Sequence, residues 1–383
     1  MKKIFSIILV LSLLSNMAVN ALANVDANGF DIQNGVLVRY SGDDSNVVIP
    51  TSVKIIGYQA FEGCTTLKYI KIPTSVTSIG PSAFSGCTSL KSITIPTSVT
   101  SFGPSTFSGC TSIVSIKLPI RVTSIGEYAF NGCKSLASIT IPTRVTSIGG
   151  NAFAQCKSLK SILIPSSVTS IGASAFVGCT SLASLTIPTK VTNIEYQTFS
   201  ACTSLKSISI PTNVKGIGAF AFSGCTSLAS ITMPNSVTSI KDRAFMNCRK
   251  LSKAIFLGDA PIMGNSVFDA CDPGFRISYY SGKTGFTNPW HGYPTKAEKY
   301  VKVKGISLNK TSLSITKGKT FKLIPTINPS NSTNKKVTWK SSNKAIATVS
   351  SNGVVKGIKK GTCYITVVTV DGKKSAKSKV VVK

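Results

Sequence analysis

The sequence IPTSVTSIGPSAFSGCTSLKSIT, residues 72–94, is one copy of a 23-residue unit that decides the fold of this chain. Three residue types recur through the middle of the chain with that same step of 23 residues. Cysteines fall at 64, 87, 110, 133, 156, 179, 202, 225, 248 and 271, phenylalanines at 61, 84, 107, 130, 153, 176, 199, 222, 245 and 268, and prolines at 50, 73, 96, 119, 142, 165, 188, 211 and 234. Such a fixed period predicts an array of stacked structural repeats.

The apolar positions of the unit predict short strands. Leu90, Ile93 and Ile95 follow the L-x-x-L-x-L pattern of a leucine-rich repeat, in which alternate side chains of a short strand point inward. A second extended piece carries Phe102 as an inward aromatic residue, and Gly103 permits the turn that follows. The AFSGC segment is expected to form one helical or 3₁₀ turn. Because one unit cannot bury these side chains alone, we expect a mainly β solenoid of about ten coils.

Both ends of such an array need capping segments. Ahead of the first repeat, alternating apolar residues flank the turn signal Asn34-Gly35, which predicts a capping hairpin. The repeat pattern breaks after Cys248, where the strand is expected to slip by one residue so that Ile255 and Leu257 point inward. A glycine- and tyrosine-rich stretch follows, and we expect it to close the array.

The repeat resembles a known family. The unit L-x-x-I-x-I-P-x-x-V-x-x-I-G-x-x-A-F-x-x-C is similar to the BspA-type (Treponema pallidum-type) leucine-rich repeat of bacterial surface proteins. The resemblance extends over about residues 30–294 and includes the NGVL-x-x-Y stretch and the GKTGFTNPWHGYP stretch. It implies a cell-surface or secreted binding protein, often an adhesin for host proteins.

The cysteine row has three possible roles. Equivalent positions in successive coils point the same way, with Cα atoms about 4.8 Å apart. Parallel Cβ vectors then leave the Cβ atoms farther apart than the ~3.8 Å typical of a disulfide. Buried reduced thiols that act as small apolar filler are therefore favoured, with some disulfides as the alternative. A metal site is least favoured, because no C-x₂-C pair or nearby histidine completes a tetrahedron.

The sequence from about residue 301 has a different character. Short alternating runs separated by turn signals about every ten residues predict seven strands of an immunoglobulin-like sandwich. Trp339 is expected in its core, and Cys363 in a strand without a disulfide partner. This stretch resembles the bacterial Ig-like group 2 domain, in VTWKSSN at residues 337–343 and NGVVKG at residues 352–357. The resemblance implies a spacer, a wall-associated unit or a binding domain.

The first residues predict export. MKKIFSIILVLSLLSNMAVNALA has the charged start, apolar middle and small-residue end of a secretory signal peptide. Its apolar run is about half of the roughly 20 residues that a membrane-spanning helix needs, which disfavours an uncleaved anchor. We therefore expect a secreted or cell-surface protein without an integral membrane segment after cleavage. The expected segments are 1–23 signal peptide, 24–49 capping hairpin, 50–271 solenoid, 272–300 C-terminal cap and linker, and 301–383 Ig-like domain.

The chain is strongly basic, with a formal net charge of +30. Residues 301–383 contain 18 lysines and a single acidic residue, Asp371. This composition can simply keep the domain soluble, or it can retain the protein on an anionic cell-wall polymer such as teichoic acid. Nucleic acid is the least favoured partner, because no aromatic stacking platform is evident. The candidate polyanion contacts are Lys335, Lys336, Lys340, Lys359, Lys360, Lys373 and Lys374.

Residues that flank the inward isoleucines are expected to point outward and to line one sheet face with hydroxyl groups. Solenoids use such extended faces to bind partners, although serine and threonine are also ordinary residues of an exposed strand. The expected ligand is a protein or glycan of a host or bacterial surface. The candidate ligand-binding residues are Tyr69, Lys71, Ser92, Thr94, Lys117, Ser138, Thr140, Ser161, Ser184 and Thr186.

Catalysis has little support in the sequence. The only histidine, His291, lies in the expected cap, and the 13 acidic residues form no evident pair. No nucleophile elbow or phosphate-binding loop is present, and we expect neither an enzyme nor a cofactor. The sequence thus predicts an exported surface protein for adhesion or ligand capture, with the basic domain as tether or spacer. The alternatives are a structural envelope or matrix component and a polyanion-binding protein without a host ligand.

Overall fold

The computed structural model describes residues 25–383, so the expected signal peptide lies outside the described residues. The chain divides into two compact units, of which the first ends at Lys296 and the second runs from Ala297 to Lys383. The described residues form strands and turns without an α- or 3₁₀-helix. Accordingly, they contain no helix that could cross a membrane.

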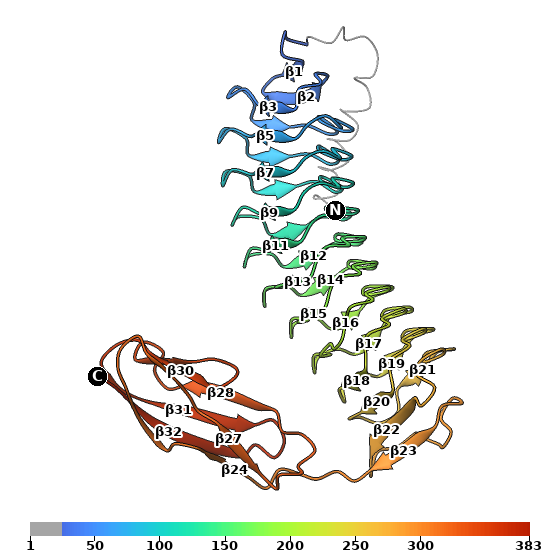
Figure 1. Cartoon of the computed structure of the whole chain (residues 1–383), viewed down its shortest axis with the longest axis vertical. Helices are drawn as coiled ribbons and strands as arrows, with labels where there is room; N and C mark the ends of the chain where they lie inside the picture. Colours follow the sequence, from blue (N-terminus) through green and yellow to red (C-terminus); the bar gives the residue numbers. More distant parts are fainter. Residues whose placement is uncertain (1–24) are drawn as a thin grey trace, which may run out of the picture. The chain divides into compact units, whose positions relative to one another are not determined.

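The first unit is a solenoid, as the repeat predicted, with about eleven turns where about ten were expected (Figure 1). The coils contribute a short strand to a first parallel array and another to a second array, except that the coil with Ser209 has only an isolated bridge to Thr186 in the first array. The first array contains β3 (Asn46–Val48), β5 (Tyr69–Lys71), β7 (Ser92–Thr94), β9 (Ser115–Lys117), β11 (Ser138–Thr140), β13 (Ser161–Ile162), β15 (Ser184–Leu185), β18 (Ser230–Met233), β20 (Lys253–Phe256) and β22 (Arg276–Tyr280). The second contains β4 (Ile55–Ile56), β6 (Ser78–Ile79), β8 (Ser101–Phe102), β10 (Ser124–Ile125), β12 (Ser147–Ile148), β14 (Ser170–Ile171), β16 (Asn193–Ile194), β17 (Gly216–Ile217), β19 (Ser239–Ile240) and β21 (Ile262–Met263).

The third side of each coil is a run of turns, and the helical or 3₁₀ turn expected for the AFSGC segment is not formed. The reason is the direction of the backbone hydrogen bonds. The Phe61 N–H donates to the Ala83 carbonyl at 2.8 Å, and the Phe84 N–H donates to the Thr106 carbonyl at 2.9 Å. Because these donors bind the next coil, they are not available for the bonds within a helix.

The interior of the solenoid contains the recurring phenylalanines as one stack of rings. From Phe61 to Phe268, successive ring centroids lie 5.0–5.6 Å apart with interplanar angles of 2–17°. Tyr40 continues the stack at one end and Phe275 at the other. Each ring therefore buries its faces against the neighbouring coils, which no single repeat could achieve.

Phe102 packs against the core as expected, and the turn expected after Gly103 is formed by residues 104–109. Phe102 is only partly buried, and its ring meets the edge of the Phe107 ring at 6.1 Å. Gly103 does not adopt a positive φ; instead, a Cβ atom at this position would lie 2.2 Å from the backbone nitrogen of Pro81. Glycine is needed here because the backbones of adjacent coils approach closely, and not because the turn is left-handed.

The N-terminal end of the solenoid is closed by a hairpin. Strands β1 (Phe30–Gln33) and β2 (Val36–Tyr40) pair antiparallel, and β2 also pairs in parallel with β4 of the first coil. The turn residues Asn34 and Gly35 have φ values of 50° and 77°. Two consecutive positive φ angles are what a type I′ hairpin turn requires. The Asn-Gly pair thus sets the turn that starts the array.

At the other end the expected strand slip is wrong. Strand β20 keeps the 23-residue register, with Ile231 opposite Ala254 and Met233 opposite Phe256. Ala254 and Phe256 are buried, whereas Ile255 is only partly buried. The backbone hydrogen bonds keep the 23-residue register here. The inward positions therefore differ from those of the preceding strand in side-chain size, with Ala254 opposite Ile231 and Phe256 opposite Met233.

The C-terminal cap accommodates this change of side chain. The ring of Phe256 packs edge-on against Trp290 at 5.6 Å, and Phe286 contacts the same indole at 4.9 Å. Strand β23 (Thr295–Glu298) ends the sheet beside β22. The large ring of Phe256, the last inward residue of β20, is therefore covered by aromatic residues that the ordinary repeats lack.

The second unit is an Ig-like β-sandwich, as the sequence indicated. Its sheets have the strand orders β24-β27, β25-β32-β31-β28 and β26-β30-β29. The strands are β24 (Gly305–Leu308), β25 (Ser312–Ile315), β26 (Thr320–Lys322), β27 (Pro325–Asn328), β28 (Val337–Ser341), β29 (Ala347–Val349), β30 (Val354–Gly357), β31 (Gly361–Thr369) and β32 (Ser375–Val382). The unit therefore has nine strands where seven were expected.

The core of the sandwich is aliphatic, and the expected central tryptophan is not in it. Leu323, Val355 and Ile365 are fully buried, whereas Trp339 is only partly buried and packs against this core. A Cβ atom on Gly353 would lie 2.8 Å from the indole, so the ring covers a glycine backbone at the margin. Cys363 is buried on β31 without a disulfide partner.

Candidate functional site

The outward residues of the first strand array form one continuous surface, which we call the hydroxyl face. On the three-residue strands β3, β5, β7, β9 and β11 the middle residue is buried and its two neighbours are exposed, as Ile93 is between Ser92 and Thr94. This is the alternation of a strand with one face in the core. All ten residues predicted to contact a ligand are exposed on this face: Tyr69, Lys71, Ser92, Thr94, Lys117, Ser138, Thr140, Ser161, Ser184 and Thr186.

Parallel pairing arranges the hydroxyl face in two rows. Tyr69 lies opposite Ser92 and Lys71 opposite Thr94, and Ser161 lies opposite Ser184 further along. Neighbouring strands of a sheet are about 4.8 Å apart, so the rows present side chains at that spacing. The structure thus places the predicted residues together, and their contact with a ligand stays a prediction.

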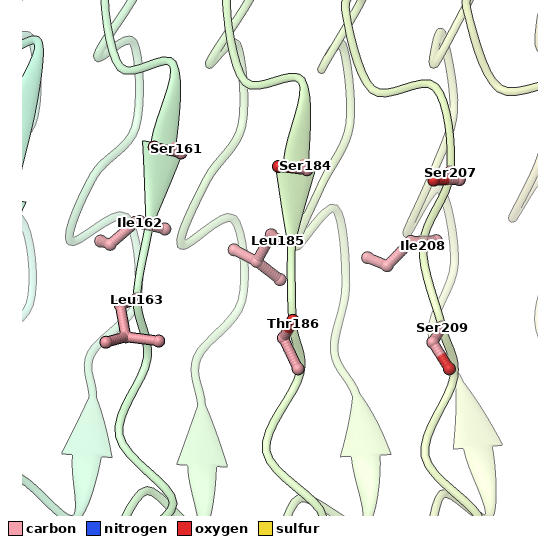
Figure 2. Close-up of a pocket in the computed structure, with 9 residues that line it drawn as sticks. All are labelled: Ser161, Ile162, Leu163, Ser184, Leu185, Thr186, Ser207, Ile208 and Ser209. Carbon is pink, nitrogen blue, oxygen red and sulfur yellow. The ribbon is translucent and has the colours of Figure 1, made fainter. Parts of the chain in front are cut away.

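A shallow hollow of about 420 Å³ opens on this face over three coils. Figure 2 shows its two outer rows of side chains with a central apolar row between them. The lining residues are Ser161, Ile162, Leu163, Ser184, Leu185, Thr186, Ser207, Ile208 and Ser209. Leu163 is 81% exposed, so the hollow has one accessible apolar side chain among hydroxyl groups.

A second hollow of about 310 Å³ lies at the N-terminal end of the same face. It is lined by Asn46, Val47, Val48, Tyr69, Ile70, Lys71, Ser92 and Thr94. Val48 and Tyr69 are 64% and 47% exposed. Val48 and Leu163 were missed as site residues, although a signal exists: both are aliphatic where equivalent coils have lysine, threonine or serine.

The cysteine row is inside the solenoid and its thiols form hydrogen bonds. All eleven cysteines of the described chain are free. The Cys156 thiol donates to the Phe130 carbonyl at 3.2 Å, and the same bond recurs from Cys87 to Cys248 with a separation of 26 residues. The thiols are therefore hydrogen-bond donors between coils as well as small apolar filler.

Burial makes these thiols poor nucleophiles. It raises the pKa of Cys133, Cys179 and Cys225 to about 12 each. Only the thiolate attacks or binds metal, so these groups are inert near neutral pH. Within residues 25–383, no cluster of three histidine, cysteine or acidic side chains could hold a metal ion.

His291 lies in the C-terminal cap, where it serves a tight turn. It is exposed, has a φ of 49°, and stands between Trp290 and Tyr293, which bridge each other. The nearby Tyr293 hydroxyl donates to Asp269 at 2.6 Å, and this hydrogen bond lowers the pKa of the Asp269 carboxyl. The described contacts of these groups join the last repeat to the cap.

The seven lysines predicted to contact a polyanion do not form one patch. Lys336 and Val370 are joined by a backbone hydrogen bond of 2.9 Å, which places Lys335, Lys336, Lys373 and Lys374 at one end of the sandwich. Lys359 and Lys360 precede β31 and lie at the opposite end of that nine-residue strand, about 30 Å away. Lys340 is separate from both groups, on the outer side of β28.

Two lysines that the fold places near Lys340 were not among the predicted polyanion contacts. Lys377 and Lys379 are exposed on β32, and Tyr364 lies between that strand and β28 on the intervening β31. We call Lys340, Tyr364, Lys377 and Lys379 the basic sheet face. The alternation in SAKSKVVV could have indicated that both β32 lysines point outward, but not which strand lies beside them.

Comparison with curated proteins finds short matches. The chain is 46% identical over 70 residues to a kappa-carrageenase of Pseudoalteromonas carrageenovora, which is 18% of each chain. It is 38% identical over 119 residues to an Ig-like virion protein of Serratia phage KSP90, which is 30% of this chain and 45% of that protein. The aligned part thus spans less than half the length of these curated relatives.

Solved structures with similar folds are bacterial leucine-rich repeat proteins. A leucine-rich cell surface protein from Faecalibacterium prausnitzii is 23% identical, with 73% of this chain and 99% of that chain covered and a TM-score of 0.43. The leucine-rich repeat protein of T. pallidum is 29% identical, with 53% and 89% covered and a TM-score of 0.38.

Family models match both units of the chain. Residues 302–380 match the bacterial Ig-like domain (group 2). Residues 39–160 and 146–273, together more than half of the chain, match the BspA-type leucine-rich repeat region. The coil geometry described above, with its Phe stack and its cysteine row, is the structure of these repeats. The chain therefore belongs to the BspA-type leucine-rich repeat family and carries a bacterial Ig-like group 2 domain.

Proposed function

We propose that this protein is exported to the bacterial cell surface and binds a protein partner there through the hydroxyl face. Membership of the BspA-type family supports a surface protein with an interaction role. The observation that carries the proposal is the hydroxyl face itself, with two in-register rows of exposed side chains and a hollow of about 420 Å³ around Leu163. Adhesion or ligand capture is the activity that this surface supports best.

The chemistry of the face favours a protein over a glycan. Serine and threonine hydroxyls both donate and accept hydrogen bonds, and a partner's polar groups can match them along the rows. Leu163 and Val48 are exposed apolar side chains on this face, and their burial against a partner would be favourable. Tyr69 is the single aromatic side chain among the predicted contacts, and it does not line the hollow around Leu163.

The test is a binding screen of the full chain against immobilised extracellular-matrix proteins and a glycan array. For each probe that binds, the variants Leu163→Thr and Ser184→Lys are compared with Ser170→Lys. Ser184 and Ser170 are both the exposed first residue of a two-residue strand, on the first and second arrays respectively. Ser170→Lys is thus a matched control.

We expect the two hydroxyl-face variants to weaken binding about tenfold or more, with Ser170→Lys unchanged. Equal effects at Ser184 and Ser170 would argue against a specific face. Absence of any binding probe would favour the alternative role as a structural envelope or matrix component. Binding only to glycans would keep the face but change the partner class.

We further propose that the basic second unit acts as tether or spacer. Its 18 lysines and one aspartate in residues 301–383 favour retention on an anionic surface polymer. Deletion of these residues followed by cell fractionation should release the protein from the surface while probe binding by the solenoid persists. Unchanged localisation would remove the tether role without affecting the proposed role of the hydroxyl face.

A further inference from the structure

The basic sheet face has a defined geometry on the outer side of the sheet β25-β32-β31-β28. Along β31 and β32, buried residues such as Ile365 and Val380 alternate with the exposed Tyr364, Lys377 and Lys379. The exposed set therefore points away from the sandwich core. Figure 1 shows β28, β31 and β32 in the second unit, next to one another in the sheet order.

The strand register places three lysines around one tyrosine. Lys379 lies directly opposite Tyr364, while Lys377 and Lys340 both lie opposite Thr366, two residues along β31. Directly opposed residues have Cβ atoms about 4.5–5.5 Å apart, and diagonal neighbours about 7–8 Å apart. All three ammonium groups are thus within side-chain reach of the Tyr364 ring, which is 47% exposed.

Acidic side chains contribute little to this face. Asp371 is the single acidic residue of residues 301–383. Its carboxylate accepts a hydrogen bond from the Val303 backbone N–H at 2.8 Å, at the turn between β31 and β32. The Asp371 carboxylate is therefore held at the end of the sandwich and does not neutralise the lysines on the sheet. A positive field concentrated on a flat surface attracts an extended anionic ligand.

We propose that the basic sheet face is a binding site for an anionic polysaccharide. Tyr364 stacks against a sugar ring, and Lys340, Lys377 and Lys379 contact the sulfate, phosphate or carboxylate groups on either side of it. Lysine suits this role because its ammonium is a compact point charge on a flexible stem. The proposal deepens the tether role proposed above, on which it rests, and names the surface and the chemical class that this role would use.

Nucleic acid fits the same face less well. Sequence-tolerant binding of single strands uses several aromatic side chains, on which successive bases stack. The basic sheet face offers one aromatic ring, and lysine alone supplies its charge. A sugar polymer with one acidic group on each repeating unit needs only one stacking position between charges, which matches this arrangement.

The experiment measures the dissociation constants of the full chain for dextran sulfate, neutral dextran, polyglutamate and an oligothymidylate. Three variants are compared: the triple variant Lys340→Ser/Lys377→Ser/Lys379→Ser, the control triple variant Lys319→Ser/Lys322→Ser/Lys356→Ser, whose lysines are exposed on or beside β26 and β30, and Tyr364→Thr. The two triple variants remove the same charge from different surfaces. Threonine keeps the strand preference at position 364, and thermal unfolding checks that each variant is folded.

We expect the first triple variant to weaken dextran sulfate binding about tenfold or more, and the control triple variant about threefold or less. Tyr364→Thr should weaken dextran sulfate binding but leave polyglutamate binding unchanged, because polyglutamate has no ring to stack. Equal losses in both triple variants, no effect of Tyr364→Thr, or tighter binding of oligothymidylate than of dextran sulfate would each overturn the proposal.

The same variants separate this site from the proposed function. Binding of solenoid probes should be unaffected by all of them, since Ser184 and the basic sheet face belong to different units. Loss of surface retention on deletion of residues 301–383, with dextran sulfate binding unaffected by the first triple variant, would support the tether and overturn this site. Specific dextran sulfate binding without any change in cell retention would support the site and remove the tether.

Discussion

The solenoid and the Ig-like unit are both built from short strands, but they close their cores in opposite ways. In the solenoid each strand pairs with the equivalent strand 23 residues away, as Ile70 does with Ile93. In the Ig-like unit β25 pairs with β32, which brings Leu313 beside Val380. Solenoid stability is thus approximately a sum over neighbouring coils, whereas the sandwich forms only when its chain ends meet. In both units the alternation of apolar and polar residues along a strand determines which side of the strand is buried. The sequence separation between paired strands determines whether the unit can fold coil by coil or only as a whole.

Alkaline pH should produce the largest difference between the two units. The pKa values of Cys133, Cys179 and Cys225 are raised by burial to about 12, from an unfolded value of about 9. Each buried neutral thiol therefore contributes stability that is fully present below pH ~9 and is lost as pH rises towards 12. At pH 10 these three thiols should together reduce the free energy of unfolding of the solenoid by roughly 4 kcal/mol, and Cys156 and Cys202, whose pKa values are also raised by burial, add to this loss.

Denaturant unfolding at pH 7 and pH 10, in the presence of a reductant, measures this effect. The chain has two tryptophans, one in each unit, so Trp339→Phe leaves Trp290 as a reporter of the solenoid. The variant Cys179→Ala should have a shallower pH dependence than the parent. An equal alkaline shift of both units would contradict the assignment to the buried thiols.

Removing one ring from the aromatic stack should have the next largest effect. Phe153 is fully buried between Phe130 and Phe176, at centroid distances of 5.4 Å on both sides. Phe153→Ala should lower the free energy of unfolding of the solenoid by about 3–5 kcal/mol, because it leaves a cavity at two coil interfaces. The Ig-like unit, followed by Trp339 in a Trp290→Phe background, should keep its midpoint. A common shift of both midpoints would show that the units unfold together.

Replacing the glycines at which adjacent coils approach closely should lower the free energy of unfolding by a smaller amount, which depends on the space at each position. A Cβ atom at Gly103 would lie 2.2 Å from backbone, whereas the nearest atom to a Cβ at Gly126 is 3.2 Å away. Gly103→Ala should therefore cost about 2–3 kcal/mol and Gly126→Ala about 1 kcal/mol or less, measured as changes in urea midpoint. Glu195 and Lys241 occupy equivalent positions, so the coils can separate where the sequence requires it. Equal costs at both glycines would contradict the role of close approach.

Substitutions at positions with a positive φ should have the smallest effect on the free energy of unfolding, and this effect should be similar in both units. Ala201 has a φ of 57° at the point where the next coil has Gly224 with a φ of 72°. Ala201→Gly should stabilise the solenoid by about 1 kcal/mol and Gly224→Ala should destabilise it by a similar amount. In the Ig-like unit Gly318, with a φ of 82° and no atom within 4 Å of a Cβ, should respond to alanine like Gly224. Opposite signs in the two solenoid variants are the decisive readout from thermal unfolding.

Much of the candidate site was predictable because it depends on local alternation. The period of two along the strands placed Ser92 and Thr94 outward, and the 23-residue period placed every equivalent residue in the same row. The hollow around Leu163 was not predicted, because its depth depends on three neighbouring coils. The basic sheet face was missed because Lys340 and Lys379 are neighbours only after β28, β31 and β32 pair.

The sequence by itself determined the repeat, the two fold classes, the family and the exposed side of each strand. Tertiary structure decided that Phe256 takes the last inward position, that the Cys156 thiol bonds the Phe130 carbonyl, and that Trp339 covers Gly353 at the margin of its core. The physical reason is that the alternation of side chains is a property of one strand. Which residues meet across strands depends instead on hydrogen-bond register between segments that are distant in the chain.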